Sequence, residues 1–193
     1  MKKLLRIILI SLILLASYSR TTVPTGVSED IHNLKTIQIL NILEFERYNK
    51  VLNNYLDLLG YDESRNQWWI TNEIGAIGEF QFMIPTLKIL GYEHITLNKF
   101  KKDPTIFLPH TQREAVLALM EHHSREMFDY IVNYEGKYIN NILITRAGIL
   151  AACHLGGPKN VKLYLDSNGH INKQDINGTS IATYLHKYQI FNL

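Results

Sequence analysis

The sequence of 193 residues has a single cysteine, Cys153, so an internal disulfide is impossible. Small exported scaffolds without a large core usually depend on several disulfides, and that class is therefore excluded. An apolar core must hold the fold instead. Cys153 stands in the apolar stretch GILAACHLGG, which is typical of a small buried side chain.

The sequence also lacks an excess of either charge. It has 20 basic and 18 acidic residues, and removing Lys2, Lys3 and Arg6 from the first segment leaves 17 basic against 18 acidic. A protein that binds nucleic acid through its net charge would carry a clear basic excess. We therefore expect no nucleic-acid partner.

A long membrane-spanning run is missing as well. The longest apolar run, IILISLILLAS at 7–17, is too short to span a bilayer comfortably, and it follows three basic residues. Small residues at Ser17 and Ser19 suit cleavage, so residues 1–19 are predicted to be a signal peptide that exports the protein to the periplasm or the exterior. An uncleaved N-terminal anchor is the alternative. No cysteine follows the run, which excludes a bacterial lipoprotein.

Repeats, low-complexity tracts and a second linker are absent too. Residues 20–30 are polar and contain Pro24 and Gly26, so they are expected to form a flexible lead-in. Residues 31–193 are then predicted to form one mostly α-helical domain. About 174 residues remain after the leader, which is enough for one domain with a substantial core.

Apolar residues at three- and four-residue spacing predict the helices. The expected segments are 31–59 (one long or two shorter helices ending near Gly60), 85–91, 111–134, 145–155, 159–165 and 179–188. Residues 60–85 are expected to be irregular, and residues 92–109 are expected to be a loop.

A short pattern stands just after the first predicted helix. Glu63-Ser64 precedes the turn Gly75-Ala76-Ile77-Gly78, Gln81 follows, and Met83 and Thr86 close the segment. In this order and spacing the chain resembles the lysozyme-like lytic transglycosylases, the superfamily of soluble lytic transglycosylases and goose-type lysozymes. Pro85 is displaced by one residue from that family's pattern, and Glu79-Phe80 replaces its Leu-Met.

The resemblance covers roughly Asn54 to the C-terminus. A second block of the family, Ala-Tyr-Asn-Ala-Gly, is replaced here by Ala152-Cys153-His154-Leu155-Gly156. The stretch DINGTSIATYLHKY at 175–188 is similar to the closing helix of a compact subgroup. The resemblance implies a single lysozyme-like helical domain that breaks the β-1,4 bond between MurNAc and GlcNAc in peptidoglycan and forms a 1,6-anhydroMurNAc end.

The resemblance also implies the site. Glu63 is the expected catalytic acid and base, and the expected substrate-binding residues are Ser64, Gly78, Gln81, Phe82, Met83, Cys153, His154 and Gly156. Neither a metal nor a cofactor is predicted. The expected partners are glycan strands and a cell-envelope machinery, and the protein is expected to be a monomer.

The chemistry of the residues agrees with this role for Glu63. Glycosidic cleavage needs a carboxyl that stays protonated until it meets the leaving oxygen, and apolar surroundings favour the protonated form. Trp68, Trp69, Phe80 and Phe82 lie close to Glu63 in the sequence and offer such surroundings. The tryptophans are candidates for stacking on sugar rings or for core packing.

Three other functions stay open. A hydrolysing lysozyme on the same fold would use a second carboxylate, for which Glu79 is the candidate. A non-catalytic glycan-binding module would keep the fold without the reaction. A peptidase or amidase would use Cys153 as its nucleophile, but neighbouring residues on a helix diverge by about 100°, so His154 is poorly placed as its base.

Overall fold

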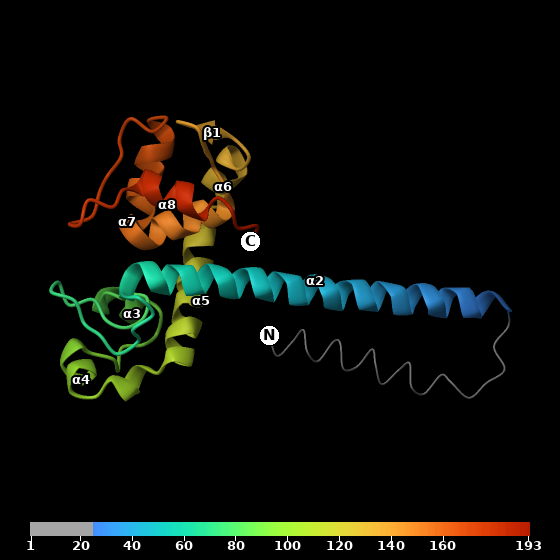
Figure 1. Ribbon diagram of the computed structural model, residues 1–193, viewed down its shortest axis with the longest axis horizontal. Helices are drawn as coiled ribbons and strands as arrows, with labels where there is room; N and C mark the ends of the chain where they lie inside the picture. The colour runs from blue at the N-terminus through green and yellow to red at the C-terminus, as the bar shows by residue number, and fades with distance from the viewer. Residues whose placement is uncertain (1–24) are drawn as a thin grey trace. The chain divides into compact units, whose positions relative to one another are not determined.

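The computed structural model describes residues 25–193, with side chains from residue 33 onward (Figure 1). The predicted signal peptide and the first residues of the lead-in lie outside these residues. Contacts divide the chain into two units, residues 1–47 and residues 48–193, which are considered separately below. No helix in the described part of the chain is long and apolar enough to cross a bilayer.

The described chain is mostly helical, as predicted, and its elements follow each other in a simple order. They are α2 (Thr25–Ser64), α3 (Ile84–Ile89), α4 (Leu97–Lys102), the 3-10 helix η1 (Pro104–Phe107), α5 (Pro109–Glu126), α6 (Phe128–Tyr134), β1 (Tyr138–Ile139), β2 (Ile142–Leu143), α7 (Arg146–Asp166) and α8 (Ile181–Tyr188). The antiparallel hairpin β1–β2 was not predicted, since each of its strands has only two residues.

Helix α2 is longer than predicted at both ends. It begins at Thr25, inside the expected lead-in, and it runs through Gly60 to Ser64. Gly60 does not stop the helix. A side chain there would meet the Cγ of Glu79 at 2.8 Å, so glycine serves the close approach of the following segment. Helix α2 ends where Arg65 and Asn66 turn left-handed, both with φ of 59°.

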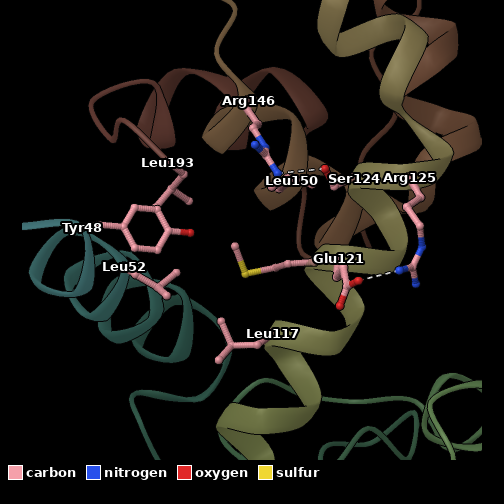
Figure 2. A pocket seen from close by; sticks show the side chains of 10 residues that line it. Tyr48, Leu52, Leu117, Glu121, Ser124, Arg125, Arg146, Leu150 and Leu193 are labelled. Carbon is pink, nitrogen blue, oxygen red and sulfur yellow. Dashed lines mark hydrogen bonds and ion pairs between the residues drawn. The ribbon is translucent and has the colours of Figure 1, made fainter. Parts of the chain in front are cut away.

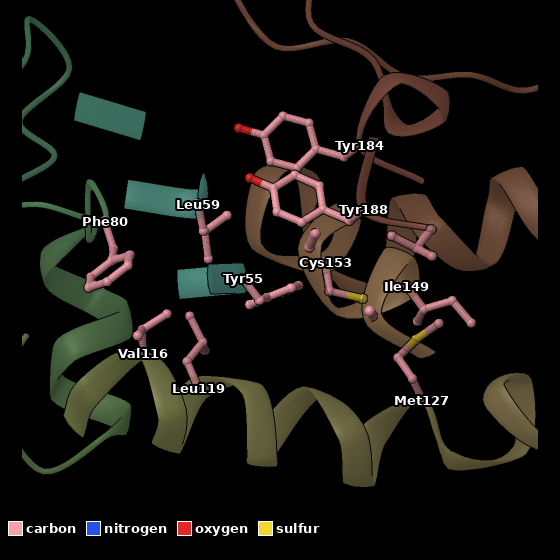
Figure 3. Packing of buried hydrophobic residues seen from close by; sticks show 14 of the residues in the cluster. Tyr55, Leu59, Phe80, Val116, Leu119, Met127, Ile149, Cys153, Tyr184 and Tyr188 are labelled. Atoms are coloured by element: carbon pink, nitrogen blue, oxygen red, sulfur yellow. The ribbon is translucent and has the colours of Figure 1, made fainter. Parts of the chain in front are cut away.

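The part of α2 in the second unit contributes one buried stripe. Tyr55, Leu56 and Leu59 are at most 2 % exposed, and their spacing places them on one face of the helix. They pack in a core with Phe80 and with residues from α5, α7 and α8, drawn in Figure 3. The second unit is therefore held by an apolar core, as the single cysteine required.

The part of α2 in the first unit has a different burial pattern. Residues 33–47 form a regular helix whose large apolar side chains are exposed rather than buried. The apolar spacing therefore predicted this helix, although its apolar side chains are not buried within the described residues.

One predicted helix is interrupted, and two others are joined. The expected helix 111–134 breaks at Met127 into α5 and α6. Helix α7 joins the expected segments 145–155 and 159–165 across Gly157, which has a non-helical φ of 76° and precedes Pro158. Proline cannot continue the hydrogen-bond ladder of the first segment, so the break at Gly157 follows directly from the sequence.

The prediction of a loop at 92–109 was wrong, because this segment contains α4 and η1. Each of these elements is short and begins at a polar cap. The Thr96 hydroxyl accepts a hydrogen bond from the amide of Lys99, and the Asp103 carboxylate accepts one from the amide of Thr105. Phe100 and Phe107 are fully buried and anchor the two elements.

Candidate functional site

Glu63 lies in the last turn of α2, which runs past the predicted end near Gly60. The amides of Arg65 and Asn66 donate to the carbonyls of Tyr61 and Gly60 at 3.0 Å each, which closes the end of the helix. The Glu63 side chain is half-buried. It is therefore held on a rigid, well-terminated element and still reaches solvent.

A residue from the far end of the chain holds this carboxyl. The Tyr184 hydroxyl on α8 donates a hydrogen bond to Glu63 Oε1 at 2.8 Å. One helical turn later, the Tyr188 hydroxyl donates to Asp62 Oδ2 at 2.8 Å, and Lys187 forms an ion pair with the same carboxylate. Two successive acidic side chains of α2 are thus clamped by two successive turns of α8.

Tyr184 remains a proton donor under all ordinary conditions. It is 5 % exposed, and burial together with the nearby Glu63 carboxylate raises the pKa of its hydroxyl far above the usual range. A hydroxyl that cannot ionise always offers its proton to Glu63. Tyr184 was not among the predicted site residues, although the spacing of four residues between Tyr184 and Tyr188 indicates two rings on one helix face.

Ser64 links α2 to the segment that crosses it. Its buried hydroxyl donates to the carbonyl of Glu79 at 2.7 Å and accepts the amide of Gln67 at 3.0 Å. Ser64 is 6 % exposed. The hydroxyl therefore positions the segment beside Glu63, and its hydrogen-bonding capacity is used within the protein.

The segment from Gly78 to Gln81 is a tight turn. Ile77 and Phe82 exchange two backbone hydrogen bonds of 2.9 and 2.8 Å across it. Gly78 and Gln81 both have positive φ, 80° and 48°. The side-chain nitrogen Nε2 of Gln81 donates to the carbonyl of Gly78 at 2.8 Å, so this side chain braces its own turn and keeps its carbonyl oxygen and one N–H for a ligand.

Gln112 on α5 accepts a hydrogen bond from the same turn, and it was not among the predicted site residues. Its carbonyl oxygen accepts the amide of Glu79 at 2.5 Å, and its nitrogen donates to the carbonyls of Trp68 and Phe107 at 2.8 and 2.6 Å. Gln112 is fully buried. The signal that could have revealed it is a polar residue on the apolar face of a predicted helix.

Glu79 is engaged through its carboxylate by Arg113. It is 4 % exposed, and Arg113 donates to its Oε1 at 3.0 Å while also pairing with Asp57. Burial raises the pKa of the Glu79 carboxyl, and the Arg113 guanidinium opposes this shift. Gly60 and Ser64, which contact Glu79, share one face of α2.

The second block of the motif contributes mainly structure. Cys153 is 1 % exposed and burial raises the pKa of its thiol, so it is an inert core residue rather than a surface contact or a nucleophile. His154 Nε2 lies 2.8 Å from the carbonyl of Phe80 and ties α7 to the turn. Gly156 packs closely against Ile181, because a Cβ there would lie 2.6 Å from the Cδ1 of that side chain.

The predicted aromatic and sulfur contacts separate into two groups. Phe82 is 2 % exposed and packs edge-on against His154, so it belongs to the core. Met83 is 40 % exposed, immediately before α3. Trp68 and Trp69 meet edge to face with centroids 5.8 Å apart, and Trp69 is 52 % exposed. Met83 and Trp69 are therefore free to contact a ligand, whereas Phe82 is not.

One hollow of about 270 Å³ adjoins this region. It is lined by Leu155, Gly156, Asn160, Lys173, Gln174, Asp175 and Ile181. Ile181 and the clamp residue Tyr184 are one turn apart on α8, and the Asp175 carboxylate contributes to the raised pKa of Tyr184. The hollow thus lies near the Glu63 clamp and combines polar groups with two apolar side chains.

A second hollow of about 250 Å³, drawn in Figure 2, contains none of the predicted site residues. Its polar side chains are mutually engaged. Arg125 pairs with Glu121 at 2.6 Å, and Arg146 donates to the hydroxyl of Ser124 at 3.0 Å. Its one carboxylate, Glu121, is paired with Arg125 and both side chains are exposed, so Glu63 remains the better candidate for acid–base chemistry.

Glu63 is therefore contacted by Tyr184 of α8, while Ser64 joins the same end of α2 to the turn 78–81 and His154 joins that turn to α7. Within the described residues, no three side chains of His, Cys, Asp or Glu are grouped as metal ligands. Comparisons with protein-family models, with curated proteins and with solved structures find no match to this chain.

Proposed function

We propose that this protein is an exported lytic transglycosylase that cleaves the glycan strands of peptidoglycan, with Glu63 as its only acid and base. The observation that carries the proposal is the half-buried Glu63 carboxyl at a helix end, bonded through Oε1 to a tyrosine hydroxyl that cannot ionise. The Glu63-Ser64, Gly75–Gly78 and Gln81 pattern supplies the chemical class.

The reaction needs one carboxyl with two roles. Glu63 first protonates the oxygen that links MurNAc C1 to the next sugar, and the C1–O bond breaks. The resulting carboxylate then takes the proton from the 6-hydroxyl of the same MurNAc, whose oxygen bonds to C1 and closes the anhydro ring. Since Oε1 accepts the hydrogen bond of Tyr184, the proton is carried on Oε2. The carboxyl ends the cycle protonated, and no water is consumed.

A hydrolysing lysozyme is the second candidate. It needs a second carboxylate that acts on a water or on the sugar carbon. Glu79 is buried and bonded to Arg113, which favours the transglycosylase over this alternative. A glycan-binding module that lacks the reaction is the third candidate.

The test is mass spectrometry of the fragments that the full chain releases from purified peptidoglycan. We expect muropeptides lighter by one water molecule than the hydrolytic ones, and we expect Glu63→Gln to release none. Glu73→Gln is the matched control, because Glu73 is an exposed loop residue ten positions away.

Each other outcome overturns part of the proposal. Hydrated products that disappear in Glu63→Gln would assign the protein as a lysozyme. Equal release by the wild type and Glu63→Gln would remove Glu63 from the reaction. Binding to peptidoglycan with no product from the wild type would leave the glycan-binding module.

A further inference from the structure

The part of α2 in the first unit is unusually apolar for an exposed helix. Within residues 33–47, seven large side chains are between 41 and 57 % exposed: Leu34, Ile37, Ile39, Leu40, Ile42, Leu43 and Phe45. Scattered exposed apolar residues are ordinary, but seven of them within residues 33–47 of one helix indicate an interaction surface. A helix that is apolar on most sides is normally covered by other protein.

One stripe of this helix has the spacing of a helix–helix seam. Lys35, Ile39, Ile42 and Glu46 follow each other at intervals of four, three and four residues, the repeat that keeps one face toward a partner helix. Ile39 and Ile42 are 57 and 49 % exposed. Two exposed isoleucines thus stand between a basic and an acidic residue.

The charged side chains at the two ends of this stripe have no partner within the described chain. Among the described residues, neither Lys35 nor Glu46 takes part in an ion pair or a side-chain hydrogen bond, and both are exposed. Opposite charges at the two ends make the stripe self-complementary when a second copy runs antiparallel. Lys35 then meets Glu46 of that copy, and Ile39 meets Ile42, about an axis between positions 40 and 41.

We infer that this stripe is a homodimer interface, in which residues 33–47 of two copies of the chain pair as antiparallel helices. Parallel pairing would set Lys35 against Lys35 and Glu46 against Glu46, and like charges in direct opposition destabilise a helix pair. The dimer replaces the monomer expected from the sequence. The inference does not depend on the proposed function, because no residue of the Glu63 site takes part.

The first test is the association of the full chain, measured by sedimentation equilibrium. Each chain has a mass of 22.4 kDa, so we expect a species of twice that mass as concentration rises. Lys35→Glu should weaken dimerisation about tenfold, because both symmetry-related pairs become repulsive. The exchange Lys35→Glu/Glu46→Lys should restore it, because each pair then has opposite charges again.

The second test is disulfide trapping of differently tagged chains produced together. Ile39→Cys with Ile42→Cys should form the mixed dimer faster than either variant forms a disulfide with itself, as antiparallel pairing requires. The native thiol does not interfere, because Cys153 is 1 % exposed. Ile89→Cys is the control, since Ile89 is 71 % exposed on α3 and should not cross-link.

Several outcomes would overturn the inference. These are a wild type that stays at the monomer mass, an exchange variant as weak as Lys35→Glu, and preferential 39–39 cross-links. Binding of a monomer to lipid vesicles through residues 33–47 would identify a membrane surface as the partner instead. Circular dichroism of each variant establishes that loss of association is not loss of the helix.

Discussion

The hydroxyl of Tyr184 fixes the orientation of the Glu63 carboxyl. It is bonded to Oε1, which under the proposed function leaves Oε2 for the substrate. A general acid gains much of its effect from such a fixed geometry, since the proton must lie within hydrogen-bond distance of the leaving oxygen. The role of Tyr184 is therefore to position Glu63, without contact to the reacting atoms.

Removing this hydroxyl should affect turnover more than folding. Tyr184→Phe keeps the buried ring and deletes the donor, so we expect kcat on peptidoglycan to fall about 10- to 100-fold. The free energy of unfolding should fall by only about 1 kcal/mol, the usual net contribution of one hydrogen bond. Steady-state kinetics and urea unfolding measure the two quantities.

Tyr188→Phe is the matched control for that prediction. It removes an equivalent hydroxyl one turn away, where the acceptor is Asp62 rather than Glu63. A similar loss of stability with nearly unchanged kcat is expected. Equal loss of kcat in both variants would mean that Tyr184 acts only through the packing of α8.

At the scale of elements, the turn 78–81 depends on a glycine. Gly78 has a φ of 80°, and a Cβ there would collide with the side chain of Gln112, which is fixed by its own three hydrogen bonds. Gly78→Ala should therefore lower the free energy of unfolding by about 2 to 4 kcal/mol, through backbone strain and displacement of Gln112.

Gly91→Ala separates these two causes. Gly91 has a similar φ of 86°, but nothing lies within 4 Å of a Cβ built there. Only the backbone strain of about 1 to 2 kcal/mol should remain. Thermal unfolding of both variants compares the two costs, and equal losses would exclude a steric role for Gln112.

Elements with strong apolar spacing or clear breakers were predictable from the sequence. The break of α7 at Gly157 and the helix α8 agree with it, whereas α2 runs on to Ser64 past its expected end near Gly60. The prediction missed α4 and η1, because each is shorter than two turns and is held by one buried phenylalanine and a capping side chain. Such elements depend on tertiary packing more than on local spacing.

The candidate site divides in the same way. Glu63, Ser64, Gly78 and Gln81 are close in sequence and form one motif, so their proximity could be foreseen. Tyr184 could not be placed, because it is 121 positions from the carboxyl that it contacts. The contacts of Gln112 and the Arg113–Glu79 pair could not be predicted either, because no local sequence pattern shows which helix will cover a turn.

At the scale of the whole molecule, stability should depend on pH through His123. This side chain is 8 % exposed, and burial, assisted by His154 and His122, lowers its pKa from 6.5 to about 4. The folded state therefore binds a proton less readily than the unfolded state. The stabilisation is complete above pH 6.5 and is lost as pH falls from 6.5 to about 4.

The loss should amount to about 3 kcal/mol. Urea unfolding at pH 7 and at pH 4.5 measures it. In His123→Gln the difference between the two pH values should shrink by most of that amount. His170→Gln is the control, because His170 is exposed, and it should keep the wild-type dependence. An unchanged difference in His123→Gln would assign acid sensitivity to other groups.

The clamp between Glu63 and Tyr184 joins an early part of the chain to its last helix. A chain that leaves a translocation channel N-terminus first presents Glu63 to the outside well before Tyr184 has been released. The Glu63 carboxyl then lacks the hydrogen bond of the Tyr184 hydroxyl, because α8 has not yet left the channel. Under the proposed function, the enzyme would start to cut its polymer only when delivery of the entire chain is complete, so the order of export would act as a timer on the reaction.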